Sequence, residues 1–296
     1  MAAERSAVEL SLILATVGRR EEFAGFLESL SRQTVGLRRF ELIVVDQNDA
    51  IDLGPIISGY PDRMEIVHLR SAVKGLSHNR NIGLGRARGR IVAFPDDDCR
   101  YYPDTLERVL RAFDAEPDVG MVVGAIYDRG RGRPVVRGWP QRRVVLDRGN
   151  FFLLYASITM FSRRTGDRFD EDMGVGRYFG GYEDTDYVFR ALSDGARCVF
   201  VPEVQVWHPD RSSDLMSPEV AASYGRGFGA FVAKNPCFPV LWLTLQVLGC
   251  HLAVCLWRIL RGDREGAARR WAAFSSRISG WFRYRRDARS GSSVRS

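Results

Sequence analysis

The first half of the chain alternates runs of β-branched apolar residues with stretches of helical periodicity. The apolar runs have the length of buried strands and occupy residues 8–15, 40–45, 64–69 and 90–94. Between them, residues 21–32 and 77–88 place apolar side chains at helical spacing, and in the second stretch Ile82 and Leu84 should point inward. This alternation is typical of βαβ units, so it predicts an α/β fold with a mostly parallel central sheet flanked by helices.

The second half continues with more widely spaced elements. The pattern predicts helices at 103–115 and 183–192 and strands at 119–126, 157–161 and 197–201. Residues 128–148 are rich in Arg, Gly and Pro, which predicts a loop over one face. No internal repeat is present, so we predict one domain over residues 1–230 and a hydrophobic, arginine-rich helical extension over residues 231–296.

The net charge of +7 is unevenly distributed along the chain. From Arg258 to the end there are 11 arginines and three acidic residues, a net charge of +8, so the preceding residues sum to −1. A duplex-binding protein needs cations across its docking face, and we therefore expect no nucleic-acid partner. The five cysteines have no paired spacing, which favours reduced thiols and a cytoplasmic location. The apolar run at 8–15 favours a first strand over a signal peptide.

Three adjacent carboxylates, Asp96, Asp97 and Asp98, follow the predicted strand at 90–94. Like charges in one crevice are stable chiefly when a cation binds there, and oxygen ligands favour Mg²⁺ or Mn²⁺. An acidic turn before the next helix explains the triplet equally well. Asp46 ends an earlier strand, and ligands of parallel sheets bind beyond the carboxyl ends of the strands.

Two further features have both a structural and a functional interpretation. After Gly180 and Gly181, Glu183 and Asp184 begin a predicted helix, where acidic residues favour the helix dipole. A carboxylate held there could equally act as a general base toward a hydroxyl. His208 follows a predicted strand, although a lone histidine is more often structural than a ligand.

Several segments between residues 8 and 234 resemble, in their order, the motifs of the inverting family 2 glycosyltransferases of the bacterial cell-surface glycan type. The similar segments are 14–16 with Arg19 (P-T-x-x-R), 44–49 (V-V-D-D-G-S), 75–83 (G-x-S-x-A-R-N-x-G), 95–98 (D-x-D), 169–171 (F-D-E), 183–184 (E-D) and 224–229. Ala15 replaces a proline of the first motif, and Gln47 and Asn48 depart from the second. The resemblance implies a GT-A fold, which is Rossmann-like.

The resemblance also implies a donor site for a nucleotide-sugar. Asp46 would accept a hydrogen bond from the pyrimidine ring, with Thr16 beside it, and Arg80 would be a further nucleotide contact. Asp97 would bind the ribose. The donor would be a UDP- or dTDP-sugar.

The same resemblance implies the reacting groups. Asp98, with Asp96 and His208, would hold a divalent cation, Mn²⁺ or Mg²⁺, which neutralises the departing diphosphate. Asp184 would be the base that deprotonates a hydroxyl of a glycan or lipid-linked acceptor, and Glu183 would orient the acceptor or share that role. One displacement then inverts the anomeric configuration.

Residues 235–257 contain no charged side chain and are long enough to span a bilayer. Two prolines, Gln246, His251 and basic residues on both flanks argue against a simple span. Beyond them, aromatic and apolar residues recur at helical spacing among arginines, at Trp271, Phe274, Ile278 and Trp281. This pattern favours helices lying on an anionic membrane surface, at the inner face of the cell membrane. The alternative is a cover for the enzyme or a homodimer contact.

Two other functions stay open. A non-catalytic, membrane-docked nucleotide-sugar-binding protein would keep this fold, although the presence of Asp98, Asp184 and His208 argues against lost turnover. A nucleotidylyltransferase would use a similar sheet, but no G-x-G-x-R loop follows the first strand.

Overall fold

The computed structural model describes residues 8–60, 64–210 and 217–290, which form two compact units. The sheet unit comprises residues 8–60, 64–74, 78–168 and 191–210. The helical unit comprises residues 75–77, 169–190 and 217–290. These units interleave along the chain and divide it differently from a boundary at residue 230, so the two expected domains stay a prediction.

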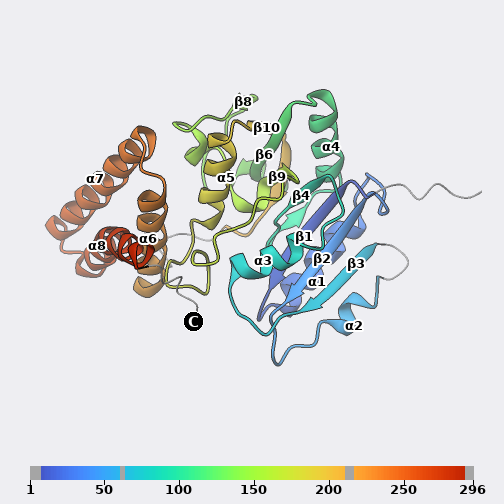
Figure 1. Cartoon of the computed structure of the whole chain (residues 1–296), viewed down its shortest axis with the longest axis horizontal. Helices are drawn as coiled ribbons and strands as arrows, with labels where there is room; N and C mark the ends of the chain where they lie inside the picture. The colour runs from blue at the N-terminus through green and yellow to red at the C-terminus, as the bar shows by residue number, and fades with distance from the viewer. Residues whose placement is uncertain (1–7, 61–63, 211–216, 291–296) are drawn as a thin grey trace, which may run out of the picture. The chain divides into compact units, whose positions relative to one another are not determined.

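In the sheet unit, ten strands of the described residues form one sheet (Figure 1). The main path runs β3 (Glu65–Arg70), β2 (Phe40–Asp46), β1 (Leu10–Thr16), β4 (Ile91–Ala93), β9 (Met160–Arg163), β6 (Val119–Asp128), β10 (Arg197–Trp207) and β5 (Arg100–Tyr101). The remaining strands, within the expected loop at 128–148, are β7 (Arg133–Pro134) and β8 (Val144–Val145). The strands from β3 to β4 are parallel, and β9 runs antiparallel to both of its neighbours. The expected α/β fold is therefore present.

The burial of the strands follows their sequences. β1 (LSLILAT) and β2 (FELIVVD) are buried almost throughout, as expected of strands covered on both faces. The helices α1 (Arg20–Ser31), α2 (Gly54–Ile57) and α4 (Thr105–Ala115) follow β1, β2 and β5, and two 3₁₀ turns, at Phe151–Leu153 and Ser157–Thr159, come later in the chain. α1 buries Phe23, Phe26, Leu27 and Leu30 on one face. The helical periodicity of this segment therefore predicted both the helix and its buried face.

The buried face of α3 (Leu76–Leu84) differs from the expectation. Ile82 and Leu84 are only half buried, whereas the polar side chain of Arg80 is among the most buried in the chain. The Arg80 guanidinium donates a hydrogen bond to Asp96 there. Ile82 and Leu84 are thus partly covered, whereas the fully buried side chain of Arg80 belongs to a polar network that the apolar pattern did not predict.

β10 extends to Trp207, beyond the expected end at residue 201, although Pro202 cannot donate to the ladder. The pairing of β10 with β6 shifts register between Phe200 and Gln205, so a bulge accommodates the proline. Gly124 on β6 permits the close approach, since a Cβ at this position would lie 2.2 Å from the Val204 carbonyl oxygen. The longer strand determines where the next residue, His208, is placed.

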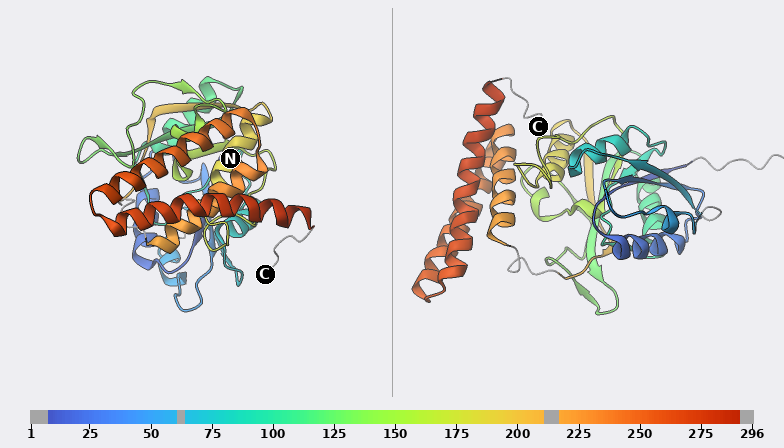
Figure 2. Two further views of the ribbon diagram at one scale, coloured as in Figure 1. Left: turned by 90° about the vertical axis from the view of Figure 1, so that its left-hand side faces the viewer. Right: turned by 90° about the horizontal axis from the view of Figure 1, so that it is seen from below.

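Three long helices, α6 (Pro218–Lys234), α7 (Phe238–Leu260) and α8 (Arg264–Arg289), lie in the helical unit (Figure 2). α7 and α8 form an antiparallel hairpin, in which the Cys255 thiol contacts the Ala267 carbonyl oxygen. α6 and α8 pack backbone to backbone, because a Cβ on Gly229 would lie 2.2 Å from the Arg277 carbonyl oxygen. The helix α5 (Glu183–Ser193) begins in this unit and ends in the sheet unit.

The hydrophobic segment forms α7, and among the described residues it is the one helix long and apolar enough to cross a membrane. Only 11% of the most apolar 18-residue stretch of this helix is buried. The aromatic and apolar residues expected to recur along α8 differ in burial, since Trp271 and Ile278 are exposed while Phe274 and Trp281 are half buried. These four side chains therefore do not form a single exposed face.

Candidate active site

The carboxyl ends of β1, β2 and β4 lie at one edge of the sheet because these strands are parallel. Thr16 ends β1 directly opposite Asp46, which ends β2. Residues 96–98 follow β4, and His208 follows β10 at the same edge, since β10 and β4 point in the same direction. Topology thus gathers the predicted donor-site residues of the sheet unit at one edge.

Thr16, Arg19, Asp97 and Asp98 form a connected hydrogen-bonded group, which we call the edge cluster. The Thr16 hydroxyl donates to Asp97 Oδ2 at 2.6 Å. Arg19 Nη1 donates to Asp97 Oδ1 at 2.9 Å and to Asp98 Oδ2 at 2.7 Å. Burial raises the pKa of Asp97 and outweighs the opposing effect of the hydrogen bonds from Thr16 and Arg19. Arg19 was part of a motif in the sequence, but its bridging position required the tertiary structure.

Arg80 supports the third carboxylate from within the protein. Its Nη2 donates to Asp96 Oδ1 at 3.2 Å and to the Ser157 hydroxyl at 3.0 Å, and its guanidinium lies 5.8 Å from the ring centroid of Phe94. These contacts make Arg80 a positioning residue for Asp96. The predicted contact of Arg80 with a nucleotide stays a prediction.

His208 faces Asp98. Its Nε2 lies 3.5 Å from Asp98 Oδ1, while its Nδ1 lies 2.8 Å from the Pro209 carbonyl oxygen. A carbonyl oxygen only accepts, so Nδ1 carries the proton in the neutral ring and the Nε2 lone pair points toward the carboxylate. Burial lowers the pKa of His208, but the charge of Asp98 raises it to a net value above the ordinary one.

The donor atoms of Asp98 and His208 fit a divalent cation in type, since carboxylate oxygen and imidazole nitrogen are both ligands of Mn²⁺. Within residues 8–60, 64–210 and 217–290, no group of three or more His, Cys, Asp or Glu side chains is arranged as a metal site. Mg²⁺-type sites commonly use one or two carboxylates and complete the coordination with substrate phosphates. The pair is therefore compatible with a cation that binds together with a donor.

Asp46 is fully buried and held by four hydrogen bonds. Its Oδ1 accepts from the Asn48 backbone and side-chain nitrogens, both at 2.8 Å, and its Oδ2 contacts His68 Nε2 at 3.0 Å and Arg70 Nη1 at 3.1 Å. Burial raises the pKa of Asp46, but these hydrogen bonds and the Arg70 charge lower it below the ordinary value. Asn48, which departs from the family motif, thus holds the carboxylate ionised. No sequence motif pointed to His68 and Arg70, which the parallel register of β3 brings to Asp46.

The helical unit holds the second group of acidic residues at the start of α5. Glu183 is buried, and Asp184 is half buried with its Oδ1 accepting from the Thr185 backbone nitrogen at 2.7 Å. The preceding turn has positive φ at Gly181 (90°) and at Tyr182 (67°). A left-handed tyrosine is uncommon, so the packing around it holds the chain in this conformation.

Lys234 connects this helix to the F-D-E segment, although no sequence motif pointed to this residue. Its Nζ lies 2.7 Å from Asp170 Oδ2 and 2.9 Å from Asp186 Oδ2. Asp186, which is fully buried, also accepts from Asn235 Nδ2 at 3.1 Å and Arg190 Nε at 2.9 Å. Composition could have pointed to this residue, because only two of the 43 basic residues in the chain are lysines.

The sequence of this chain is similar to those of known glycosyltransferases. A family model described as glycosyl transferase family 2 matches residues 11–169. The poly(ribitol-phosphate) β-N-acetylglucosaminyltransferase TarP of Staphylococcus aureus is 24% identical over 167 residues, 54% of this chain and 50% of TarP. The minor teichoic acid biosynthesis protein GgaB of Bacillus subtilis is 37% identical over 93 residues, 30% of this chain and 10% of GgaB. The chain spans 37% and 38% of the length of two further curated relatives, an uncharacterized glycosyltransferase of Haemophilus influenzae and a glucosyl-dolichyl phosphate glucuronosyltransferase of Haloferax volcanii.

Two solved structures share the fold over nearly the whole chain. Residues 1–349 of S. aureus TarS, in complex with UDP-GlcNAc, have a TM-score of 0.63 at 18% identity, covering 97% of this chain and 93% of that one. The mannosyltransferase PcManGT of Pyrobaculum calidifontis, in complex with GDP-Man and Mn²⁺, has a TM-score of 0.63 at 15% identity, covering 94% of this chain and 87% of that one. The expected GT-A fold is thereby confirmed.

Proposed function

Because the chain belongs to glycosyltransferase family 2, we propose that it transfers a sugar from a UDP- or dTDP-sugar to a hydroxyl of a glycan or lipid-linked acceptor, in the synthesis of a cell-surface polysaccharide. The observation that carries this proposal is the edge cluster, in which two buried carboxylates lie at the carboxyl ends of parallel strands. This is where open α/β sheets bind their ligands. The ligands in the TarS and PcManGT structures support a nucleotide-sugar donor.

In the proposed donor complex, the pyrimidine ring replaces one of the present hydrogen bonds to Asp46, and Asp97 accepts a hydrogen bond from the ribose. The hydrogen bonds that already hold these carboxylates restrict their orientation before the donor binds. Preorganised acceptors lose little conformational entropy on binding, so they contribute more of their interaction to affinity.

Asp98, His208 and Asp96 would hold the divalent cation. A cation at this position supplies positive charge to the diphosphate, on which negative charge develops as it leaves. His208 keeps its Nε2 toward Asp98 through the contact of Nδ1 with the Pro209 carbonyl oxygen. This outer contact is the kind that orients a ligating histidine.

Asp184 is the proposed base. Its carboxylate takes the proton of the acceptor hydroxyl while that oxygen forms a bond to the anomeric carbon. The bond from this carbon to the diphosphate oxygen breaks on the opposite face, and the nucleoside diphosphate leaves with the electron pair. The outcome is inversion in one displacement, with Glu183 orienting the acceptor.

We place the enzyme at the inner face of an anionic cell membrane, with the α7–α8 hairpin in the plane of the interface. Leu245 and Leu260 on α7 are 65% and 86% exposed. α8 runs back along α7 and carries many arginines, so a bilayer-spanning α7 would bring these charges into the hydrocarbon. Flotation with anionic liposomes tests this location. Protein that remains at the bottom of the gradient at low salt would instead favour a cover or homodimer role for the hairpin.

A screen of nucleotide-sugars for thermal stabilisation, with and without Mn²⁺, tests the function. A bound donor raises the melting temperature by mass action, and we expect stabilisation only with the cation present. The stabilising donor then enters a transfer assay with glycan acceptors. If no nucleotide-sugar stabilises the protein or is consumed, the proposed activity is wrong.

A further inference from the structure

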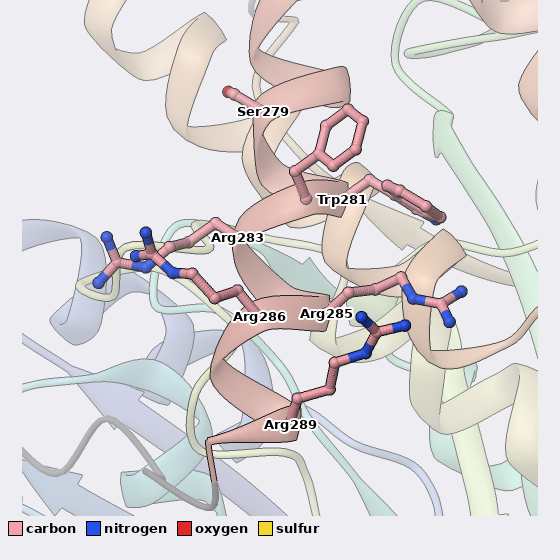
Figure 3. Close-up of a pocket in the computed structure, with 7 residues that line it drawn as sticks. Ser279, Trp281, Arg283, Arg285, Arg286 and Arg289 are labelled. Carbon is pink, nitrogen blue, oxygen red and sulfur yellow. The ribbon is translucent and has the colours of Figure 1, made fainter.

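α8 carries four residues at a spacing of four, and side chains at this spacing share one face of a helix. They are Arg277, Trp281, Arg285 and Arg289, which we call the α8 stripe. Figure 3 shows Arg285 and Arg289 projecting from the side of α8 on which Trp281 lies. The Arg285 guanidinium lies 5.1 Å from the Trp281 ring centroid.

The arginines of the stripe differ in their partners from those beside them. Arg283 and Arg286 point to the other side of α8 (Figure 3) and contact Asp287 at 2.7 and 3.5 Å. In the part of the chain that the structure describes, none of the three stripe arginines forms an ion pair with a carboxylate. The stripe therefore carries three positive charges that no carboxylate of the described residues neutralises.

An apolar cavity of about 250 Å³ lies beside the stripe, between α6, α7 and α8. Its walls include Phe228, Leu241, Leu248 and Ile278, together with Arg277 and Trp281. This space opens to solvent and its walls are mainly apolar, so an apolar group that displaces water from it is favoured by the hydrophobic effect. Trp281 also lines an open groove of about 840 Å³, together with Phe282 and four arginines, Arg283, Arg285, Arg286 and Arg289. The tryptophan is thus the shared wall between an apolar space and a cationic one.

The cationic character extends into the cavity wall. Arg277 donates to the Ala273 carbonyl oxygen and lies 5.4 Å from the Phe228 ring centroid. Burial lowers the pKa of Arg277. The pKa of His251 on α7 falls to about 4 through burial and the charges of Arg277 and Arg270. Both shifts have the direction expected where positive charge is partly desolvated without a carboxylate, a condition that a bound anion relieves.

We propose that the α8 stripe and the cavity bind a lipid phosphate, with the apolar chain in the cavity and the phosphate on Arg285 and Arg289. Guanidinium groups bind phosphate oxygens through paired hydrogen bonds, and the Trp281 ring bridges the two parts of such a ligand. A free phosphate would leave the cavity unused, and an uncharged lipid would leave the arginines without an anion. The site contains none of the proposed catalytic or donor-binding residues.

Titration calorimetry of the full chain with a series of alkyl phosphates tests the proposal. Each buried methylene contributes about 0.8 kcal/mol, roughly a fourfold gain in affinity. Octyl phosphate should therefore bind at least about tenfold more tightly than ethyl phosphate or inorganic phosphate. Equal affinities for the three compounds would show that the cavity takes no chain and would overturn the proposal.

The double variant Arg285→Gln/Arg289→Gln should bind octyl phosphate about tenfold more weakly or worse. The matched control is Arg261→Gln/Arg264→Gln, which removes the same charge from exposed positions at the turn of the hairpin. The control should stay within about twofold of the unmodified protein, since long-range charge effects are screened by salt. Equal losses in both variants would mean nonspecific charge attraction and would refute the site. Transfer to a water-soluble acceptor should be unchanged in both, which separates this test from that of the proposed activity.

Two probes distinguish the source of the lipid phosphate. Farnesyl phosphate represents an isoprenoid carrier, and phosphatidic acid in phosphatidylcholine vesicles represents a membrane phospholipid. Tighter binding of the first, lost in Arg285→Gln/Arg289→Gln, assigns the site to a lipid-linked acceptor, and the converse assigns it to the membrane. Failure of the unmodified protein to bind either probe would overturn the proposal.

Discussion

The Thr16 hydroxyl donates a 2.6 Å hydrogen bond to Asp97, joining the end of β1 to a loop 81 residues further along the chain. Both side chains are buried, so each needs a partner within the protein. Arg19 contacts the other oxygen of Asp97 and continues to Asp98. The orientation of the carboxylates therefore depends on a network that does not require a ligand.

Thr16→Val removes this hydrogen bond while keeping the shape of the side chain. A buried carboxylate that loses a partner costs about 1–3 kcal/mol, so we expect a lower free energy of unfolding and about tenfold weaker donor binding. Urea denaturation and calorimetry measure the two effects. Thr34→Val is the control, because Thr34 bonds to Glu107 in an exposed pair and should change stability by less than about 0.5 kcal/mol. Equal effects in the two variants would contradict a special role for Thr16.

Asp98→Ala should abolish the cation dependence of donor binding. Asp98 Oδ1 lies 3.5 Å from His208 Nε2, and the substitution leaves His208 as the remaining ligand of this proposed pair. Calorimetry with UDP-sugars, with Mn²⁺ and with a chelator, measures the change. The result that would contradict the assignment is unchanged donor affinity in the presence of the cation.

Asp184→Asn should lower transfer by about 10²–10⁴-fold while donor binding stays nearly constant, since general-base catalysis contributes factors of this size. Glu183→Gln tests the neighbouring carboxylate and should mainly raise KM for the acceptor. Turnover with the best donor and acceptor, measured beside donor affinity, separates the roles. Full turnover by Asp184→Asn would rule this residue out as the base.

Lys234→Met should destabilise the protein at neutral pH by about 2 kcal/mol or more, because it leaves Asp170 and Asp186 without their shared cation. Burial raises the pKa of Asp170, but Lys234 lowers it to a net value below the ordinary one. The stabilisation is therefore present above pH ~4 and is lost as the pH falls through the folded pKa. Without the lysine, protonation becomes favourable, so the stability difference between the two proteins should narrow in acid.

The other lysine of the chain provides the control for this test. Lys74 pairs with Asp49, whose side chain is 81% exposed. Surface pairs contribute little, and Lys74→Met should change the free energy of unfolding by less than about 1 kcal/mol at any pH. Denaturant titrations of both variants between pH 3 and pH 7 make the comparison. A Lys234→Met protein as stable as Lys74→Met at neutral pH would show that the buried network is dispensable.

Gly229→Ala should destabilise the helical unit by about 2 kcal/mol, since the added methyl would meet the α8 backbone at Arg277 and Trp281. Gly249→Ala on α7 is the matched control, because nothing lies within 4 Å of a Cβ at that position. Alanine is a better helix former than glycine, so this second change should stabilise by about 0.5–1 kcal/mol. Thermal unfolding distinguishes opposite signs, and a neutral Gly229→Ala would contradict the close packing of α6 on α8.

Sequence periodicity predicted most of the secondary structure and failed where polar groups are buried. The apolar face of α1 was predicted because burial of apolar area is local and periodic. The burial of Arg80 on α3 was not predicted, because its partners Asp96 and Ser157 lie far along the chain. β10 was predicted too short because Pro202 normally ends a strand, whereas a bulge against β6 accommodates it.

The candidate site divides in the same way. The identities of Asp46, Asp97, Asp98 and Asp184 were predicted by motif order, since each motif is contiguous in sequence. The partners of these residues were not, because contacts such as Arg19 to Asp98 and Lys234 to Asp186 join distant segments. No local pattern reports such pairs.

The sequence by itself determined that this chain would form an α/β sheet with acidic residues at strand ends, followed by an apolar and arginine-rich extension. Hydrophobic periodicity and charge are local properties, and one chain is enough to show them. The tertiary structure alone decided which carboxylates share an arginine or a lysine. It also decided which arginines of α8 lie beside an apolar cavity and have no carboxylate partner among the described residues. Those outcomes depend on strand register and helix packing, in which residues far apart in sequence compete for the same partners.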